Sequence, residues 1–182
     1  MTLVIPTHRT LLFQILKEIY SNTDIAPFLG FKGGTACFFF YNLPRFSTDL
    51  DFNLIDSSKA QIVFTKIQKI IQNYGTVKDK KDKANTIYFL LSYKPNSYNI
   101  KIEISKRSNP FDKYEVKHYL GLQVLTMKQE CLSAHKLCAI TDRKQLAPRD
   151  LFDAWFMLKN SWPISEEIIR SRTNKSQKEY FA

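Results

Sequence analysis

A glycine pair followed closely by two alternating aspartates constrains this chain more than any other feature of its sequence. The pair is Gly33-Gly34, and the aspartates are Asp49 and Asp51. Glycine lets the backbone turn sharply and approach a ligand closely, and the first N–H groups of a helix that begins there suit an anion. Residues i and i+2 of a strand share a face, so the two carboxylates would project side by side. This order predicts a site for a divalent metal and a nucleotide.

Two polar residues stand directly before the aspartates. Arg45 supplies a cation and Ser47 a hydroxyl where the phosphate groups of a nucleotide would lie. The other interpretation is a tight turn and two acids on a strand surface, and neither motif alone excludes it. The order strand, turn, helix, strand favours the site.

A third carboxylate comes from residues 98–105, where isoleucines alternate with polar residues. This period of two predicts a strand that carries Lys101 and Glu103 on its polar face. If that strand neighbours the aspartate strand, three carboxylates converge, which is unfavourable without a cation. Mg²⁺, or Mn²⁺ in its place, would resolve the repulsion, because magnesium binds a few carboxylates together with substrate phosphates. An ordinary solvent-facing Lys/Glu pair explains this segment equally well.

The remaining pattern contains strands and helices without a regular βαβ rhythm, which predicts an α+β domain. We expect Thr7 to cap the first helix, Thr126 to cap another with Gln129 three residues later, and Ser165 to cap a short one. The other expected segments are a helix over 58–74, strands over 28–32, 48–55 and 86–93, an irregular stretch over 106–119, a helix from Pro148 to 159, and a frayed tail over 172–182.

Charge is the unusual part of the composition. The chain has 27 Lys and Arg against 17 Asp and Glu, a net charge of +10. Residues 59–118 hold thirteen of the basic residues against five acids. Such an excess favours an anionic polymer as partner, nucleic acid before an anionic membrane. A lysine-rich solvated surface is the alternative.

Cysteine usage bears on the compartment. Cys37, Cys131 and Cys138 are odd in number and lack metal-ligand spacing, which suits unpaired, buried thiols in a reducing compartment. The sequence shows no signal-peptide pattern, and its longest apolar run is too short to span a bilayer. We therefore expect a cytoplasmic protein with no membrane partner.

Four ordered motifs resemble those of the AbiEii/AbiGii-type nucleotidyltransferase toxins, part of the polymerase-beta-like nucleotidyltransferase superfamily. Lys32–Ala36 with Arg45–Phe52 is similar to the first motif, and Ile100–Ile104 to the second. Glu130–Ile140 resembles the third and Arg149–Trp155 the fourth. The order of the four is far more specific than any one of them.

The resemblance implies a nucleotidyltransferase fold: a mixed sheet flanked by helices over residues 1–125, and a helical C-terminal part over 126–182 that closes the active-site cleft. It implies Mg²⁺-dependent transfer of a nucleoside monophosphate from an NTP to an acceptor hydroxyl, with release of pyrophosphate. Family members act as toxins of toxin–antitoxin systems of the phage-defence type, so an antitoxin or regulator encoded alongside becomes an expected partner. Some modify the 3′ end of tRNA, so tRNA or another nucleic acid is the expected acceptor.

The resemblance also implies roles for particular residues. Alone, Lys136 reads as a solvated helix lysine, and Asp150 as an acid stabilised in the first turn of a helix. The implied metal ligands are Asp49, Asp51 and Glu103. The implied nucleotide-binding residues are Gly33, Gly34, Thr35, Arg45, Ser47, Lys101 and Lys136. The implied catalytic residues are Asp49, Asp51, Glu103, Lys136 and Asp150.

Two other functions keep the same motifs. The acceptor could be a protein side-chain hydroxyl, as in protein-nucleotidylating enzymes, although the positive charge argues mildly against this. A non-catalytic domain that binds nucleotide or RNA is the other alternative, and the intact acid pair argues against it. No motif fixes the preferred NTP, because base choice depends on pocket shape.

Overall fold

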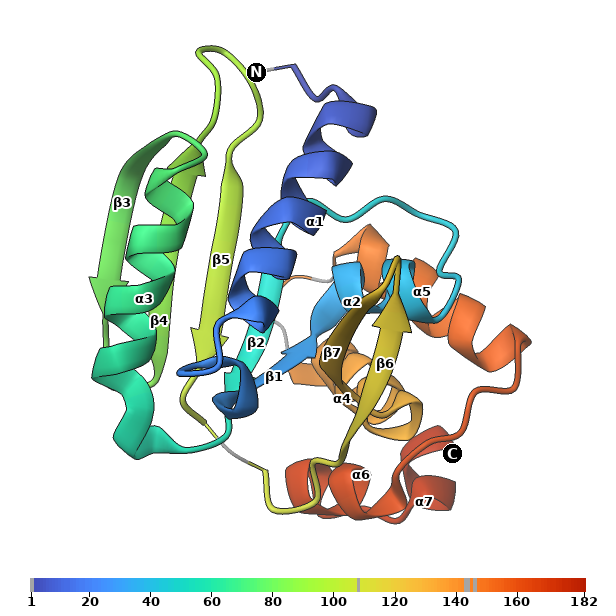
Figure 1. Cartoon of the computed structure of the whole chain (residues 1–182). Coiled ribbons are helices and arrows are strands. Elements are labelled where there is room, and N and C mark those ends of the chain that lie inside the picture. The colour runs from blue at the N-terminus through green and yellow to red at the C-terminus, as the bar shows by residue number, and fades with distance from the viewer. Residues whose placement is uncertain (1, 108, 143–144, 146) are drawn as a thin grey trace. The chain divides into compact units, whose positions relative to one another are not determined.

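A computed structural model of the chain describes residues 2–107, 109–142, 145 and 147–182 (Figure 1). Its residues divide into two compact units, Met1–Ser108 with Val116–Thr126 and Asn109–Glu115 with Met127–Ala182. The predicted role of residues 126–182 in closing a cleft stays a prediction. Within the described part of the chain, no helix is both long and apolar enough to cross a membrane.

A mixed sheet forms the framework of the first unit. Its strands are β1 (Leu29–Lys32), β2 (Leu50–Leu54), β3 (Thr76–Asp82), β4 (Thr86–Ser92), β5 (Ile100–Ser105), β6 (Tyr114–Tyr119) and β7 (Leu122–Met127). Among the described residues these seven strands run in the order β3-β4-β5-β2-β1-β7-β6. Strand β2 is antiparallel to β1 and parallel to β5, and β5 is antiparallel to β4. The predicted α+β class with a mixed sheet and flanking helices is confirmed.

Two helices cover one face of this sheet, and both are labelled in Figure 1: α1 (Ile5–Ser21) and α3 (Ala60–Gln72), the latter after the short 3₁₀ helix η2 (Ser57–Lys59). The ring of Phe64 in α3 lies 5.0 Å, centroid to centroid, from the ring of Phe89 in β4. In β5, buried isoleucines alternate with partly exposed Lys101 and Glu103, as the period of two predicts. Each fully buried large apolar side chain stabilises the fold by about 1.5–3 kcal/mol. The apolar face is therefore held by packing, and the opposite face of β4 and β5 is left partly exposed.

The glycine pair opens the helix α2 (Gly33–Phe40). Gly33 has a φ of 79°, in the left-handed region that side chains rarely adopt. The strand β1 ends at Lys32, so the helix follows its extended backbone with no residue between them. The sharp strand-to-helix turn predicted from the glycines is thereby confirmed.

Three local predictions about the sheet and its first helix were wrong. Helix α1 begins at Ile5 with Pro6 in its first turn, so Thr7 lies inside the helix rather than at its cap. The stretch expected to be irregular over 106–119 contains β6. Thr126 lies in β7, opposite Phe31 of β1, so it cannot cap the helix that follows. In the last two cases strand pairing decided the structure over a local pattern.

The second unit is helical. Its helices are α4 (Gln129–Asp142), α5 (Pro148–Lys159), α6 (Glu166–Thr173) and α7 (Gln177–Phe181). Helix α5 has the predicted bounds, and the Ser165 side chain accepts from the Ile168 N–H, as predicted for a cap. The tail predicted to fray instead forms α7, because Ser176 and Glu179 make a reciprocal capping box.

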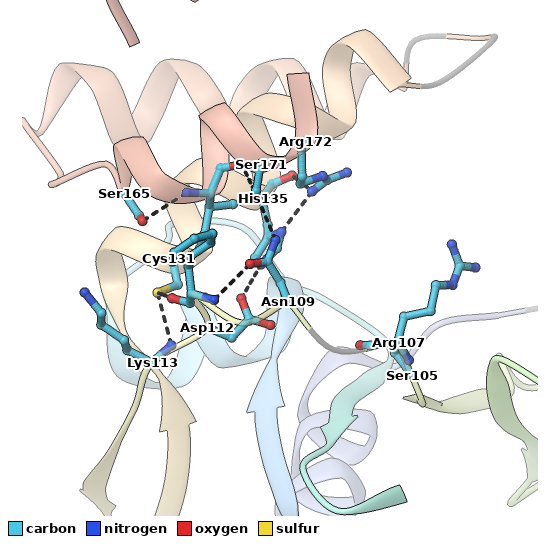
Figure 2. A network of polar contacts seen from close by, with 12 residues as sticks. Ser105, Arg107, Asn109, Asp112, Lys113, Cys131, His135, Ser165, Ser171 and Arg172 are labelled. Atoms are coloured by element: carbon cyan, nitrogen blue, oxygen red, sulfur yellow. Dashed lines mark hydrogen bonds and ion pairs between the residues drawn. The ribbon is translucent and has the colours of Figure 1, made fainter. Parts of the chain in front are cut away.

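A polar network ties the loop before β6 to the helices of the second unit (Figure 2). His135 of α4 donates from Nε2 to Asp112 Oδ1 over 2.6 Å and accepts at Nδ1 from Arg172 of α6 over 2.9 Å. Asn109 donates to Ser171 Oγ over 3.0 Å. Beside them, buried Cys131 accepts from the Lys113 N–H over 3.4 Å. The network fixes His135 as a donor at one nitrogen and an acceptor at the other, which orients the ring.

Candidate active site

Carboxylates gather on the polar face of the sheet where β2 lies beside β5. Asp51 and Glu103 are register partners in this parallel pair, and Asp49 stands one residue before β2 begins. Lys101 Nζ lies 3.4 Å from Asp49 Oδ2 and 3.5 Å from Glu103 Oε2. The condition set for the site, that the two strands be neighbours, is therefore met, and the strands bring the predicted acids and Lys101 together.

The glycine turn closes against these acids. A Cβ at Gly33 would lie 2.5 Å from Asp51 Oδ2, and one at Gly34 would lie 2.8 Å from Ser47 Oγ and 3.0 Å from an Arg45 guanidinium nitrogen. Such contacts are far inside van der Waals distance, so only glycine leaves the turn this close to its neighbours. The turn, the guanidinium and the hydroxyl thus lie against one another, beside the first carboxylates.

Thr35 connects the turn to the acids. Its hydroxyl donates to the backbone carbonyl of Asp49, and the residue is buried. This hydrogen bond lets the Thr35 side chain hold the backbone of Asp49 in place. Its predicted contact with a nucleotide stays a prediction.

Like charges raise the proton affinity of this site. Burial raises the pKa of Asp51, the charges of Asp49 and Glu103 raise it further, and Lys101 and Lys32 oppose them. Burial alone would lower the pKa of Lys101, but the three carboxylates outweigh it and raise that pKa above its ordinary value. The site therefore favours any added positive charge.

The donor set fits a hard divalent cation only with help from a substrate. Among the described residues, no three His, Cys, Asp or Glu side chains are gathered closely enough to hold a metal ion by themselves. Asp49 and Asp51 are oxygen donors on adjacent positions of one face, and magnesium is bound by one or two carboxylates plus phosphates. The fit to Mg²⁺ or Mn²⁺ thus rests on these two residues. The role of Glu103 as a third ligand stays a prediction.

The sequence reasoning missed His8, which lies on α1 and is fully buried. Its Nε2 donates to the carbonyl of Thr48 over 2.9 Å, and its Nδ1 accepts from the Tyr93 hydroxyl over 3.0 Å. Burial lowers the pKa of His8, although the bond to Thr48 and the charge of Asp49 oppose that effect. Neutral His8 therefore holds the backbone just before Asp49. No local signal at position 8 points to residue 48, because the contact exists only in the folded chain.

The second unit holds the other two predicted residues together in a cluster of their own. Lys136 Nζ of α4 lies 3.4 Å from Asp150 Oδ1 and 2.8 Å from Asp153 Oδ2, both on α5. Both carboxylates are fully buried. Asp153 received no site role from the sequence, although it stands one helical turn after Asp150, at the spacing that places both on one face.

Comparison with known proteins supports the predicted family. Residues 14–180 match the family described as "Nucleotidyl transferase AbiEii toxin, Type IV TA system". The chain belongs to the AbiEii nucleotidyltransferase toxin family. AbiEii members are nucleotidyltransferases, so the predicted enzyme class and the predicted toxin–antitoxin family are confirmed. A search of curated proteins found no match.

Solved structures show the same fold. A Helicobacter pylori protein assigned as a nucleotidyltransferase is 28% identical, with a TM-score of 0.62, over 92% of this chain and 73% of that one. JHP933 from Helicobacter pylori is 27% identical, with a TM-score of 0.62, over 94% and 74%. The antibiotic-resistance factor ANT(2'')-Ia shares the fold, with a TM-score of 0.61 at 15% identity over 93% and 91%. The AbiEii chain described here therefore has a nucleotidyltransferase fold.

Proposed function

We propose that this AbiEii protein transfers a nucleoside monophosphate from an NTP to the 3′-terminal hydroxyl of an RNA, with tRNA as the acceptor, and that this makes it the toxin of its toxin–antitoxin pair in phage defence. An antitoxin encoded alongside is the proposed protein partner, and the cytoplasm, which supplies NTPs and tRNA, is the proposed compartment. The observation that carries the proposal is the gathering of Asp49, Asp51 and Glu103 beside the Gly33-Gly34 turn.

The proposed binding site of the triphosphate lies on the β1 side of the acids. Arg45 and Ser47 meet at Gly34, where the absence of a side chain leaves the backbone accessible to a phosphate oxygen. The N-terminus of α2 adds a partial positive charge at the same place. Lys101, fixed between the acids, adds a formal charge nearby.

The acids carry the chemistry of the proposed transfer. Asp49 and Asp51 would hold Mg²⁺ or Mn²⁺, which when bound would neutralise phosphate charge and lower the barrier to attack. The acceptor oxygen forms a bond to the α-phosphorus, the bond from the α-phosphorus to the bridging oxygen of the β-phosphate breaks, and pyrophosphate leaves. The Glu103 carboxylate takes the proton of the acceptor hydroxyl as a general base.

The charge of the chain supports a nucleic-acid acceptor. Its net charge is +10, and thirteen of its basic residues fall within residues 59–118. Basic surfaces bind phosphate backbones without reading sequence, so most of these lysines would add affinity and salt dependence rather than specificity.

Lys136 and Asp150 enter the proposal as a second pair of functional residues. Their support is the geometry of their own cluster, in which the Lys136 ammonium lies against two fully buried carboxylates. Such a lysine is held in one orientation, which suits a phosphate contact. Asp150 would then hold Lys136 in that orientation.

One assay tests the function. The protein is incubated with each labelled NTP, Mg²⁺ and total tRNA, in parallel with an Asp49→Ala variant of matched thermal stability. Label that joins tRNA with the native protein and is lost with the variant supports the proposal. Label on protein instead would replace the proposed acceptor with a side-chain hydroxyl. Absence of label on every acceptor, from a folded sample, would overturn transfer altogether.

A further inference from the structure

One row of side chains continues from the carboxylates across three further strands of the first unit. Asp51 of β2 pairs with Glu103 of β5, Glu103 pairs with Tyr88 of β4, and Tyr88 pairs with Lys81 of β3. Residues directly opposite one another across a sheet point to the same face. With neighbouring strands about 4.8 Å apart, Tyr88 stands about 10 Å and Lys81 about 15 Å from Asp51.

This face of β4 is free of the helices that cover the other. Along β4, buried and partly exposed positions alternate, and Tyr88 belongs to the partly exposed set. Its neighbour Phe89 points the opposite way, into the packing with Phe64 of α3. Figure 1 shows α3 lying along β3 and β4 on that packed side. On this face the Lys81 ammonium lies 5.9 Å from the centroid of the Tyr88 ring.

The reaction proposed above predicts which part of the substrate meets this face, so the inference rests on the proposed function. In phosphoryl transfer the attacking and leaving oxygens lie roughly in line on opposite sides of the phosphorus. Pyrophosphate would leave toward the glycine turn on the β1 side of β2. The acceptor must therefore approach from the opposite side, over β5, β4 and β3. Glu103, Tyr88 and Lys81 are the side chains that it meets in turn.

We propose that Tyr88 and Lys81 form a binding platform for the unpaired end of a nucleic-acid acceptor, with a base stacked on the Tyr88 ring and a backbone phosphate at Lys81. An exposed aromatic ring next to a basic side chain is the combination that binds single strands, because every base has a face to stack and every nucleotide has a phosphate. Tyr88 and Lys81 are binding residues here, and Glu103 remains the only residue of the three that touches the reacting hydroxyl.

The present partner of Lys81 does not block this role. Its Nζ lies 2.6 Å from Asp79 Oδ2, with side chains 51% and 36% exposed. Exposed ion pairs contribute little to stability. A phosphate can therefore take the ammonium from Asp79 at small cost.

The neighbouring lysine offers a matched control. Lys80 pairs with Phe89 in the register, so it points to the other face, and its Nζ donates to Gln68 of α3 over 3.1 Å. Lys80→Gln and Lys81→Gln remove the same charge from adjacent positions on opposite faces. A non-specific charge effect would weaken binding equally in both.

The test measures binding of a fluorescent single-stranded RNA 12-mer, labelled at its 5′ end, by anisotropy without NTP, with a blunt RNA duplex beside it. Stacking on one ring predicts that Tyr88→Ala weakens single-strand binding about 5- to 100-fold, while Tyr88→Phe stays within about 2-fold of the native protein. Lys81→Gln should reduce the slope of log affinity against log salt by about one, and Lys80→Gln should not. The duplex should bind less tightly than the single strand and respond little to Tyr88→Ala.

Three results would overturn the platform: native affinity in Tyr88→Ala, equal losses in Tyr88→Ala and Tyr88→Phe, or equal losses in Lys80→Gln and Lys81→Gln. The comparison of alanine with phenylalanine separates stacking from a folding defect, and a thermal melt of each variant supports it. Failure here is distinct from failure of the proposed function. Transfer to RNA that Tyr88→Ala leaves unchanged rejects the platform alone, and single-strand binding that needs Tyr88 without any transfer rejects the reaction alone.

Discussion

Two lysines of this protein each stand among carboxylates, but in opposite surroundings. Lys101 is 31% exposed and lies between Asp49 and Glu103, which are 20% and 42% exposed. Lys136 is 17% exposed and lies against Asp150 and Asp153, neither of which is exposed at all. The first cluster can exchange partners with ions and substrates at little cost. In the second cluster both carboxylates are closed to solvent, so they hold the partly exposed lysine in one orientation.

The largest effect should come from the open cluster, which consists of Lys101 with Asp49, Asp51 and Glu103. Asp51→Asn keeps the shape of the side chain and removes one carboxylate, so we expect nucleotide transfer to fall by about 10³-fold or more, the loss of several kcal/mol of charge stabilisation. The melting temperature should stay level or rise, because burial and its acidic neighbours already disfavour the Asp51 charge. Initial rates and thermal melts measure the two. Transfer within tenfold of the native rate would contradict the assignment.

The same substitution at the two lysines should separate the clusters by stability. Lys136→Met removes the ammonium that lies against two buried carboxylates and should lower the free energy of unfolding by about 3 kcal/mol. Lys101→Met, at a partly exposed position, should cost about 1 kcal/mol or less. Denaturant titration of both variants gives the difference. Equal losses would mean that the contrast in burial has no energetic counterpart.

Added metal should act on the open cluster alone. At a Mg²⁺ concentration about ten times its dissociation constant, binding would stabilise the folded protein by about 1.4 kcal/mol and raise the melting temperature by a few degrees. Asp51→Asn should lose this shift, whereas Asp153→Asn, in the buried cluster around Lys136, should keep it. Thermal shift with and without EDTA measures it. A shift that survives Asp51→Asn would place the metal elsewhere.

The smallest expected effect is a pH dependence of stability that comes from His8, which holds the backbone next to Asp49 of the open cluster. Burial lowers the folded-state pKa of His8 below its ordinary value of 6.5. The unfolded chain therefore binds a proton first as the pH falls below 6.5, and the folded state loses stability from there down through its own pKa.

The measurement for His8 compares melting temperatures between pH 7 and 5.5. The native protein should lose more over this range than His8→Gln, which has no proton to gain at that position. Parallel pH profiles of the two proteins would show that His8 does not titrate in this window. Histidines elsewhere cancel in the comparison because both proteins contain them.

Features with a local cause could be predicted from the sequence. The alternation around Lys101 and Glu103 gave β5, because a period of two is imposed by the pleat itself. The glycine pair gave the turn, because a φ of 79° at position 33 suits little else. Ser176 and Glu179 have the same kind of local cause, and their S-x-x-E spacing was the signal that would have found α7.

Features set by distant partners could not be predicted. Strand β6 has only half-buried and exposed positions, so its sequence carries no clear apolar pattern, and pairing in the sheet makes it a strand. The sequence after Thr126 suits a helix cap, but pairing with Phe31 of β1 places Thr126 in the strand β7. His8 is a site residue only because folding brings Thr48 to it. Of the predicted site, the acids and the turn were found from patterns, and Lys136 and Asp150 from the order of family motifs.

The parallel pairing of β2 with β5 has a consequence for synthesis of the protein. Asp51 and Glu103 are register partners, yet α3 and the β3–β4 hairpin lie between them in the chain. Parallel pairings across long loops form slowly and late, and chains fold as they leave the ribosome. A nascent chain that ends before β5 has Asp49 and Asp51 but no Glu103 beside them. The proposed acid set therefore assembles only after the ribosome has released β5, which delays any toxic activity until this unit is nearly synthesised.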